Sequence, residues 1–148
     1  MRPSSIFSHT LDEIAAFLKI QSVSGEIRVT GVTSNSKDVR PGDLFVALPG
    51  ARVHGLDFAS QAIALGAVAI LSDRKLSQQS IPSLVVNDPR AQLGGLANWF
   101  YGEPTRNLAV YGITGTNGKT TTTHLLFQIW QRNGIASGLI GTVGLQIG

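Results

Sequence analysis

The chain contains no cysteine, which excludes disulfide bonds, a thiolate metal site and a cysteine nucleophile. It also has no long apolar run, although hydrophobic residues make up 43% of its 148 residues. No stretch approaches the roughly 18 apolar residues that a membrane-spanning helix requires. Asp12 and Glu13 interrupt the first apolar segment, so we expect no signal peptide. We therefore expect a cytoplasmic protein that has no membrane partner.

Charge of either sign is sparse, since charged residues make up 14% of the chain and the net charge is +3. Lysine and arginine are scattered along the chain, so we predict no nucleic-acid partner. All nine acidic residues lie between Asp12 and Glu103, and none follows. A nucleotide site after Glu103 would therefore lack the nearby carboxylate that normally helps to hold Mg²⁺.

Glycine and threonine are concentrated in one segment beyond that point. Residues 112–121 read Gly-Ile-Thr-Gly-Thr-Asn-Gly-Lys-Thr-Thr, with an apolar run at 108–111 before them and an amphipathic stretch at 124–132 after them. The order strand, glycine-rich loop and helix is typical of a phosphate-binding loop. Glycines let successive backbone N–H groups turn toward one anion, and the start of the helix adds its positive dipole end.

The residues of this loop have distinct predicted roles. Lys119 brings positive charge to the outer phosphates of a nucleotide, and Thr120 places a hydroxyl where it can ligate Mg²⁺, so these two are the candidate catalytic residues. The spacing departs from the common pattern, because Ile113 stands where the first glycine should be. A glycine-rich turn with an incidental lysine is the alternative interpretation. The predicted nucleotide-binding residues are Gly115, Thr116, Asn117, Gly118, Lys119, Thr120 and Thr121.

This departure from the common pattern points to a family. The stretch T-G-T-N-G-K-T-T-T at 114–122 resembles the ATP loop of the Mur ligases, the amide-forming enzymes of peptidoglycan precursor synthesis. Residues 34–37 and 41–50, which include Pro-Gly-Asp-Leu-Phe-Val-Ala-Leu, resemble the first domain of the MurE and MurF types. Residues 137–144 resemble the strand that follows the loop helix in the MurE type. The resemblance covers nearly the whole chain and favours the MurE type.

The resemblance also implies substrate contacts in the first part of the chain. Ser34 and Ser36 match family positions near the uridine and diphosphate, although Asn35 stands where the family more often has aspartate. Arg52 and His54 lie in a segment that resembles a substrate-facing loop, where they would contact the diphosphate. Without the resemblance, the first segment is a polar turn before a strand and the second is a solvated loop.

Hydrophobic periodicity predicts strands alternating with helices, and hence an α/β fold. We expect a small α/β domain at 1–102 that binds the UDP precursor, a linker at 103–107, and the first βαβ unit of an incomplete P-loop domain at 108–148. The expected elements are a helix at 11–18 capped by Thr10 or Ser8, strands at 27–32 and 44–48, a helix at 57–65 capped by Asp57, strands at 68–71 and 83–86, a helix at 89–101 capped by Asp88, a strand at 108–113, a helix at 119–132 and a strand at 136–140.

Two sets of apolar residues carry further expectations. Trp99, Phe100 and Tyr101 end the helix before the linker, and we expect them to anchor it against the linker. Four residues of the last helix follow helical spacing and are predicted to be core: Leu125, Leu126, Ile129 and Trp130.

The resemblance implies an ATP-dependent ligase that adds diaminopimelate or lysine to UDP-N-acetylmuramoyl-L-alanyl-D-glutamate through an acyl phosphate. The implied cofactors are ATP and Mg²⁺, the implied partners are the UDP-muramoyl dipeptide and an amino acid, and we expect a monomer. The family's middle-domain glutamate, histidine and carbamylated lysine have no counterpart before Gly148, so we expect the chain to be inactive by itself. The alternatives are a non-catalytic nucleotide- or UDP-sugar-binding remnant, a MurF-type ligase and a folylpolyglutamate-type ligase.

Overall fold

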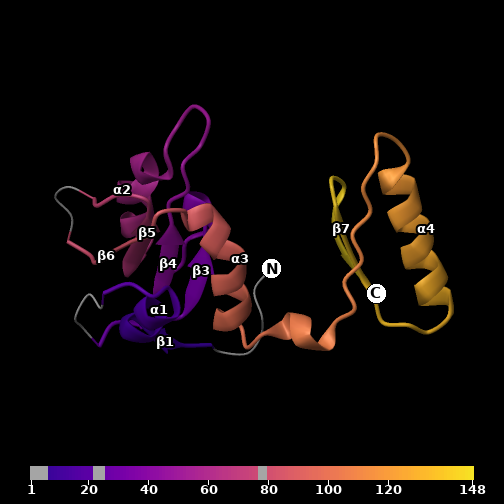
Figure 1. Cartoon of the computed structure of the whole chain (residues 1–148), viewed down its shortest axis with the longest axis horizontal. Helices are drawn as coiled ribbons and strands as arrows, with labels where there is room; N and C mark the ends of the chain where they lie inside the picture. Colours follow the sequence, from indigo (N-terminus) through magenta and orange to yellow (C-terminus); the bar gives the residue numbers. More distant parts are fainter. Residues whose placement is uncertain (1–6, 22–25, 77–79) are drawn as a thin grey trace. The chain divides into compact units, whose positions relative to one another are not determined.

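The computed structural model describes residues 7–21, 26–76 and 80–148 of the chain. The chain divides into two compact units, Met1–Leu108 and Ala109–Gly148. The first contains a four-stranded parallel sheet flanked by helices, and the second contains one long helix and a two-stranded hairpin (Figure 1).

The sheet of the first unit has its four parallel strands in sequence order, which confirms the predicted α/β class. Leu44 in the second strand lies opposite Val32 in the first strand and Ala69 in the third. Because all strands run the same way, their carboxyl ends lie at one edge of the sheet. The strands are β3 (Gly31–Thr33), β4 (Asp43–Val46), β5 (Ala69–Ser72) and β6 (Ser83–Val85).

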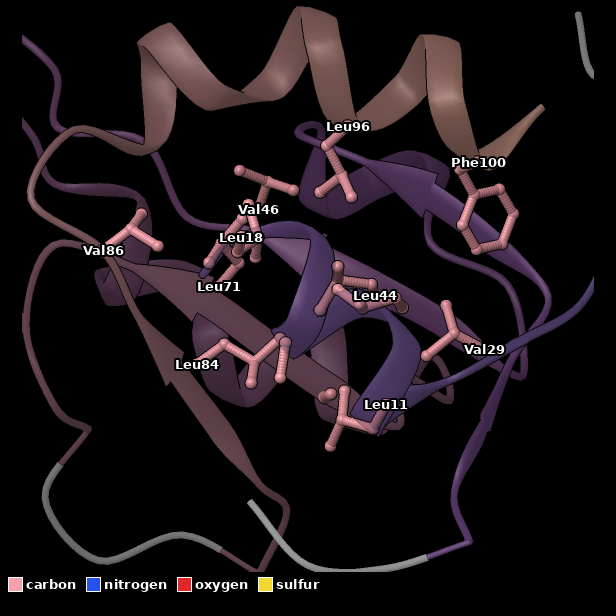
Figure 2. Packing of buried hydrophobic residues seen from close by; sticks show 13 residues of the cluster. Leu11, Leu18, Val29, Leu44, Val46, Leu71, Leu84, Val86, Leu96 and Phe100 are labelled. Carbon is pink, nitrogen blue, oxygen red and sulfur yellow. The ribbon is translucent and has the colours of Figure 1, made fainter. Parts of the chain in front are cut away.

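Both faces of this sheet are covered, since successive side chains along a strand point to opposite faces. Leu44 and Val46 of β4 pack with α1 (Leu11–Phe17) and α3 (Pro89–Phe100). On the other face, Phe45 packs with α2 (Ala59–Ala64). Figure 2 shows the first of these clusters, with side chains of α3 directed at the strands. Every residue of β4 and β5 is buried, as expected for parallel strands that are covered on both faces.

Helices α1 and α3 begin where the sequence predicts. The Thr10 hydroxyl accepts the Glu13 N–H at 3.2 Å, and the Glu13 carboxylate accepts the Thr10 N–H at 2.8 Å, which completes a capping box. Asp88 caps α3 by accepting the N–H groups of Arg90 and Ala91, each at 3.0 Å. These caps fix the first turns of the two helices that cover the same face of the sheet.

The helical segment after β4 begins differently from the prediction. A 3₁₀ turn, η2 (Gly55–Phe58), precedes α2, and its N-cap is His54. The prediction of Asp57 as the cap is wrong, because the His54 Nδ1 accepts the Leu56 N–H at 3.0 Å. Asp57 instead accepts the His54 N–H at 3.1 Å and completes a capping box that the imidazole begins.

The predicted single strand at 27–32 is two short strands. β2 (Arg28–Val29) pairs antiparallel with β1 (His9–Thr10), while β3 begins at Gly31 and pairs with β4. Between them, the Thr30 N–H donates to the Gly42 carbonyl at 2.8 Å. The strand is split because its first half pairs with the segment before α1 and its second half joins the main sheet.

The aromatic residues at the end of α3 pack on the body of the first unit, so the prediction that they anchor against the linker is wrong. Trp99 stacks on Phe17 of α1 with ring centroids 4.9 Å apart, and Phe100 is fully buried. The Tyr101 hydroxyl accepts the Val32 N–H of β3 at 3.2 Å. After α3 the chain forms a 3₁₀ turn, η3 (Pro104–Asn107).

The second unit consists of α4 (Lys119–Arg132) and a hairpin of β7 (Gly138–Gly141) and β8 (Gly144–Ile147). The bounds of α4 are those predicted, but the strand predicted at 108–113 is not formed. A strand requires a ladder of hydrogen bonds with a neighbour, and no described strand pairs with that segment. The predicted βαβ unit is therefore a helix followed by an antiparallel hairpin.

The hairpin covers only one side of α4. Leu126 and Trp130 line a cavity of about 80 Å³ together with Leu139 of β7. Leu125 and Ile129 lie away from the cavity and are 56% and 52% exposed. The prediction that these four residues are core is wrong, because no residue of α4 is buried: Leu126 and Trp130 are half-buried, and the other side of the helix has no covering element among the described residues.

Candidate functional site

The glycine-rich loop leads directly into the first turn of α4 (Figure 1). Gly118 is the N-cap of this helix and has a φ of +76°, a left-handed conformation that favours glycine. Lys119 is the first helical residue, and α4 has 14 residues, so its dipole and unpaired N–H groups are directed at the loop. Of the predicted order of strand, loop and helix, the loop and the helix are present.

Lys119 is exposed and folds back over the loop. Its Nζ donates to the carbonyl oxygens of Gly115 and Thr116. Carbonyl oxygens carry partial negative charge, so the ammonium group occupies a position where phosphate oxygens can replace these acceptors. The second unit contains Lys119 and Arg132 and no acidic residue, so its electrostatic field favours an anion.

The threonines after Lys119 divide into two kinds. Thr123 donates its hydroxyl to the carbonyls of Lys119 and Thr120, at 3.0 and 2.9 Å, and so belongs to the helix backbone network. Thr120 and Thr121 are exposed at the start of α4. His124 Nδ1 lies 2.8 Å from the Thr120 carbonyl, which can only accept, so Nδ1 is the donor. This bond ties His124 to the surface of α4.

The donor set for Mg²⁺ is only partly present in the second unit. Mg²⁺ is usually held by one or two carboxylates together with substrate phosphates and water. Thr120 supplies a hydroxyl oxygen, but no carboxylate lies in residues 109–148. In the described ranges, no three His, Asp or Glu side chains gather where they could hold a metal ion. These residues could supply one protein ligand, the Thr120 hydroxyl, to a Mg²⁺ ion that a nucleotide also binds. They do not form a complete metal site.

The predicted substrate contacts gather at the carboxyl edge of the parallel sheet, the usual ligand side of such sheets. Ser34 and Ser36 follow β3, and Arg52 and His54 follow β4, the neighbouring strand. Ser34 and Arg52 are exposed. The structure therefore brings two segments that are separate in sequence to one edge.

Ser36 is 9% exposed, and its hydroxyl donates to Gln61 Oε1 of α2 at 2.9 Å. A hydroxyl has one proton, so the remaining capacity of Ser36 is to accept a hydrogen bond. No sequence pattern identifies Gln61, because a glutamine in the middle of a helix is usually a solvated side chain.

His54 already has protein partners at both ring nitrogens. Nδ1 accepts the Leu56 N–H, so Nε2 carries the proton and donates to Asp73 Oδ1 at 3.0 Å. Arg52 keeps an exposed side chain, but His54 holds the loop together. The role of His54 as a diphosphate contact remains a prediction, and the structure adds a structural role for it.

Sequence reasoning missed two charged residues at this edge. Asp73 follows β5, and Arg90 lies in the first turn of α3, where its Nη2 donates to the Pro49 carbonyl at 2.8 Å. Burial raises the pKa of the Asp73 carboxyl, but the hydrogen bond and charge of Arg74 and the contact with His54 outweigh it and lower the pKa. The position of Asp73 directly after a buried strand was the signal that could have identified it.

The described residues include no helix that is long and apolar enough to cross a bilayer. Comparison with protein families identifies two matches along the chain. Residues 28–101 match the profile of the Mur ligase family, catalytic domain, and residues 113–148 match that of the Mur ligase middle domain. Both the carboxyl edge of the parallel sheet and the glycine-rich loop thus lie in matched segments.

Individual proteins give the same result. A relative from Streptomyces coelicolor, named UDP-N-acetylmuramoyl-L-alanyl-D-glutamate–2,6-diaminopimelate ligase, is 48% identical over 99% of this chain, and the chain spans 30% of its length. A crystal structure of MurF from Acinetobacter baumannii is 28% identical, with a TM-score of 0.71 over 93% of this chain and 30% of its own. A MurF ligase structure from Thermotoga maritima, in complex with ADP, is 36% identical, with a TM-score of 0.55 over 68% of this chain and 23% of its own.

Proposed function

The chain belongs to the Mur ligase family, and from this we propose that it forms the N-terminal part of an ATP-dependent ligase. The proposed reaction adds diaminopimelate to UDP-N-acetylmuramoyl-L-alanyl-D-glutamate, the reaction for which the Streptomyces coelicolor relative is named. The observation that carries the proposal is the loop at 115–121, which ends in Lys119 and Thr120 at the start of a 14-residue helix. ATP chemistry of this kind favours a cytoplasmic location, and we propose a monomer.

We assign the two units to different ligands, the UDP precursor and ATP. Residues 1–102 form the domain that binds the UDP end of the precursor, residues 103–107 are the linker, and residues 108–148 begin the ATP-binding domain. The two matched family profiles support this division. Within the first domain the proposed contacts are Ser34, Ser36, Arg52 and His54.

In the proposed reaction the terminal D-glutamyl carboxylate attacks the γ-phosphorus of ATP, which forms an acyl phosphate and releases ADP. The amine of diaminopimelate then attacks the acyl carbon, forms the amide bond and expels phosphate. The N–H groups of residues 116–121 cradle the nucleotide phosphates, and Lys119 offsets the charge on the outer ones. Thr120 contributes one oxygen to Mg²⁺, which neutralises phosphate charge when it is bound.

A MurF-type activity is the second candidate, because solved MurF structures share this fold. The MurF type would act on the UDP-tripeptide and a D-alanyl-D-alanine dipeptide. One experiment separates the two candidates, and a second tests the 148-residue chain by itself. The longer protein in which this sequence forms the N-terminal part is assayed for ADP release with each pair of substrates, and with lysine in place of diaminopimelate.

We expect ADP release with the UDP-dipeptide and diaminopimelate. Release only with the UDP-tripeptide and D-alanyl-D-alanine would establish the MurF type, and release with lysine would correct the amino acid. In the second experiment, the 148-residue chain itself is tested by calorimetry and for turnover. We expect it to bind the UDP-dipeptide without turnover, and measurable ligation by this chain would refute the need for further residues.

A further inference from the structure

The loop between β4 and η2 is closed at its base and tight at its tip. Pro49 and His54 face each other in an isolated antiparallel bridge. A Cβ atom on Gly50 would lie 2.4 Å from the Val53 carbonyl oxygen, so a side chain does not fit at this position. The exposed tip consists of Ala51, Arg52 and Val53.

One end of this loop is fixed from α3, 41 residues away in sequence. Arg90 Nη2 donates to the Pro49 carbonyl at 2.8 Å. The main chain of Arg90 is itself held by the Asp88 cap, and α3 is held by Leu96 and Phe100, which are fully buried. The guanidinium group therefore reaches the loop from a rigid base. A hydrogen bond from a charged donor is stronger than a neutral one.

The other end of the loop is fixed from the segment after β5. His54 donates from Nε2 to Asp73 Oδ1 at 3.0 Å, and its side chain is 15% exposed. Asp73 is held in turn by Arg74, whose Nε donates to the same oxygen at 3.2 Å. The two ends of the loop are thus bound to two different neighbouring elements, and the tip between them is left free to meet a ligand.

We propose that Arg90 is a positioning residue for substrate binding, which holds the Pro49 carbonyl and thereby keeps loop 49–54 in the shape that receives the UDP-muramoyl ligand. The inference rests on the proposed function of the first unit as the precursor-binding domain. Arg90 acts through the loop backbone and does not touch the ligand. A loop that is ordered before binding loses less conformational entropy on binding, which is what Arg90 contributes.

The test compares Arg90→Met and Arg90→Lys with Arg28→Met in the 148-residue chain. Arg28 is an exposed arginine of β2 in the same unit, so its loss changes the net charge equally. The affinity for UDP-N-acetylmuramoyl-L-alanyl-D-glutamate is measured by calorimetry. Hydrogen exchange is measured at the Gly55 amide, which donates to the Leu48 carbonyl at 2.9 Å, and at the Ala47 amide, which donates to Leu71 of β5.

For Arg90→Met we expect an affinity about tenfold weaker, in line with the loss of one charge-assisted hydrogen bond. The Gly55 amide exchanges faster, while the Ala47 amide, which reports on the sheet, is unchanged. Arg90→Lys recovers part of the affinity, because the lysine ammonium group can also donate to the Pro49 carbonyl, but its flexible stem holds the donor less firmly than the planar guanidinium group does. Arg28→Met behaves as the wild type.

Three results would overturn the inference. Equal affinity of Arg90→Met and Arg28→Met removes any role for Arg90 in binding. Weaker binding with unchanged exchange at Gly55 shows a direct contact with the ligand, and faster exchange at Ala47 as well shows a general loss of stability. If the wild-type chain does not bind the UDP-dipeptide at all, the proposed function of the first unit fails and the inference with it, a result distinct from the other three.

Discussion

At the scale of single residues, hydrogen-bond partners decide what each candidate side chain can offer a ligand. The Ser36 hydroxyl donates its one hydrogen bond to Gln61, so it can only accept a hydrogen bond from a ligand. His54 uses both ring nitrogens within the protein. Lys119, in contrast, donates to two carbonyl oxygens of its own loop, Gly115 and Thr116, and phosphate oxygens could take the place of these acceptors. Residue type therefore identifies a candidate binding residue, and its hydrogen-bond partners within the protein determine what it can offer a ligand.

Replacement of Lys119 by methionine tests the nucleotide site. We expect Lys119→Met to weaken binding of MgATP by at least about tenfold, because a charged hydrogen bond to phosphate is lost. Arg132→Met is the matched control, since it removes the other cation of the unit from the far end of α4. Fluorescence titration with an ATP analogue measures both. Equal affinities for the two variants would contradict the assignment of the loop.

The capping box of α1 makes a prediction about pH. The Thr10 N–H lowers the pKa of the Glu13 carboxyl, and His9 adds to this effect, although burial opposes it. A carboxyl group whose pKa is lowered by folding stabilises the protein above its unfolded pKa, and this contribution is lost as the pH falls through the lowered folded value.

We therefore expect wild-type protein to be more stable than Glu13→Gln near pH 7, and the difference to disappear as the pH falls well below about 4. Urea unfolding monitored by circular dichroism at a series of pH values measures this difference. A stability difference that stays constant down to pH values where Glu13 is protonated would mean that the carboxylate charge plays no part.

At the scale of elements, hydrophobic periodicity does not decide whether a segment forms a strand. That depends on whether a neighbouring strand is available for pairing. The caps of α1 and α3 are local, so Thr10 and Asp88 were predictable from sequence. The 108–113 segment has the apolar composition of a strand but lacks a paired neighbour among the described strands. Gly144–Ile147 forms β8 although no prediction was made there, because its partner is the adjacent β7.

Two serines on neighbouring strands provide a matched test of buried hydroxyl groups. Ser72 of β5 is fully buried and donates to the Arg74 carbonyl, whereas the Ser83 Oγ of β6 is buried without a hydrogen-bond partner among the described residues. We expect Ser72→Ala to destabilise the protein by about 1–2 kcal/mol, and Ser83→Ala to be neutral or stabilising by up to about 1 kcal/mol. Urea unfolding measures both, and equal destabilisation would show that Ser83 has a partner.

At the scale of the whole molecule, the two units differ in how much apolar surface they bury. The first unit has a buried cluster on each face of its sheet. In the second unit, Leu139 is the one buried apolar side chain among the described residues. Stability follows buried apolar area, so the two units are expected to differ in local stability.

Hydrogen exchange tests this difference. We expect amides of β4 and β5 to exchange at least about a hundredfold more slowly than amides of α4 and β7, because opening of the second unit exposes little apolar surface. Exchange followed by mass spectrometry or NMR measures each element in one experiment. Similar protection of β4 and α4 would mean that the second unit is stabilised by contacts beyond those described.

The sequence by itself determined the features that depend on neighbouring residues. The α/β class, the caps of α1 and α3, the bounds of α4 and the loop at 115–121 all follow from local spacing, turn residues and helix caps, whose energies are set within a few positions. The family resemblance added the predicted substrate positions and the proposed reaction.

Tertiary structure alone decided the features that depend on residues distant in sequence. It joins Ser36 to Gln61, His54 to Asp73 and Arg90 to the Pro49 carbonyl, contacts that span 25, 19 and 41 positions. It also decides which sides of α4 are covered. The reason is that a side-chain hydrogen bond or an apolar contact requires only proximity in space, which a parallel sheet creates between segments that no short-range pattern connects.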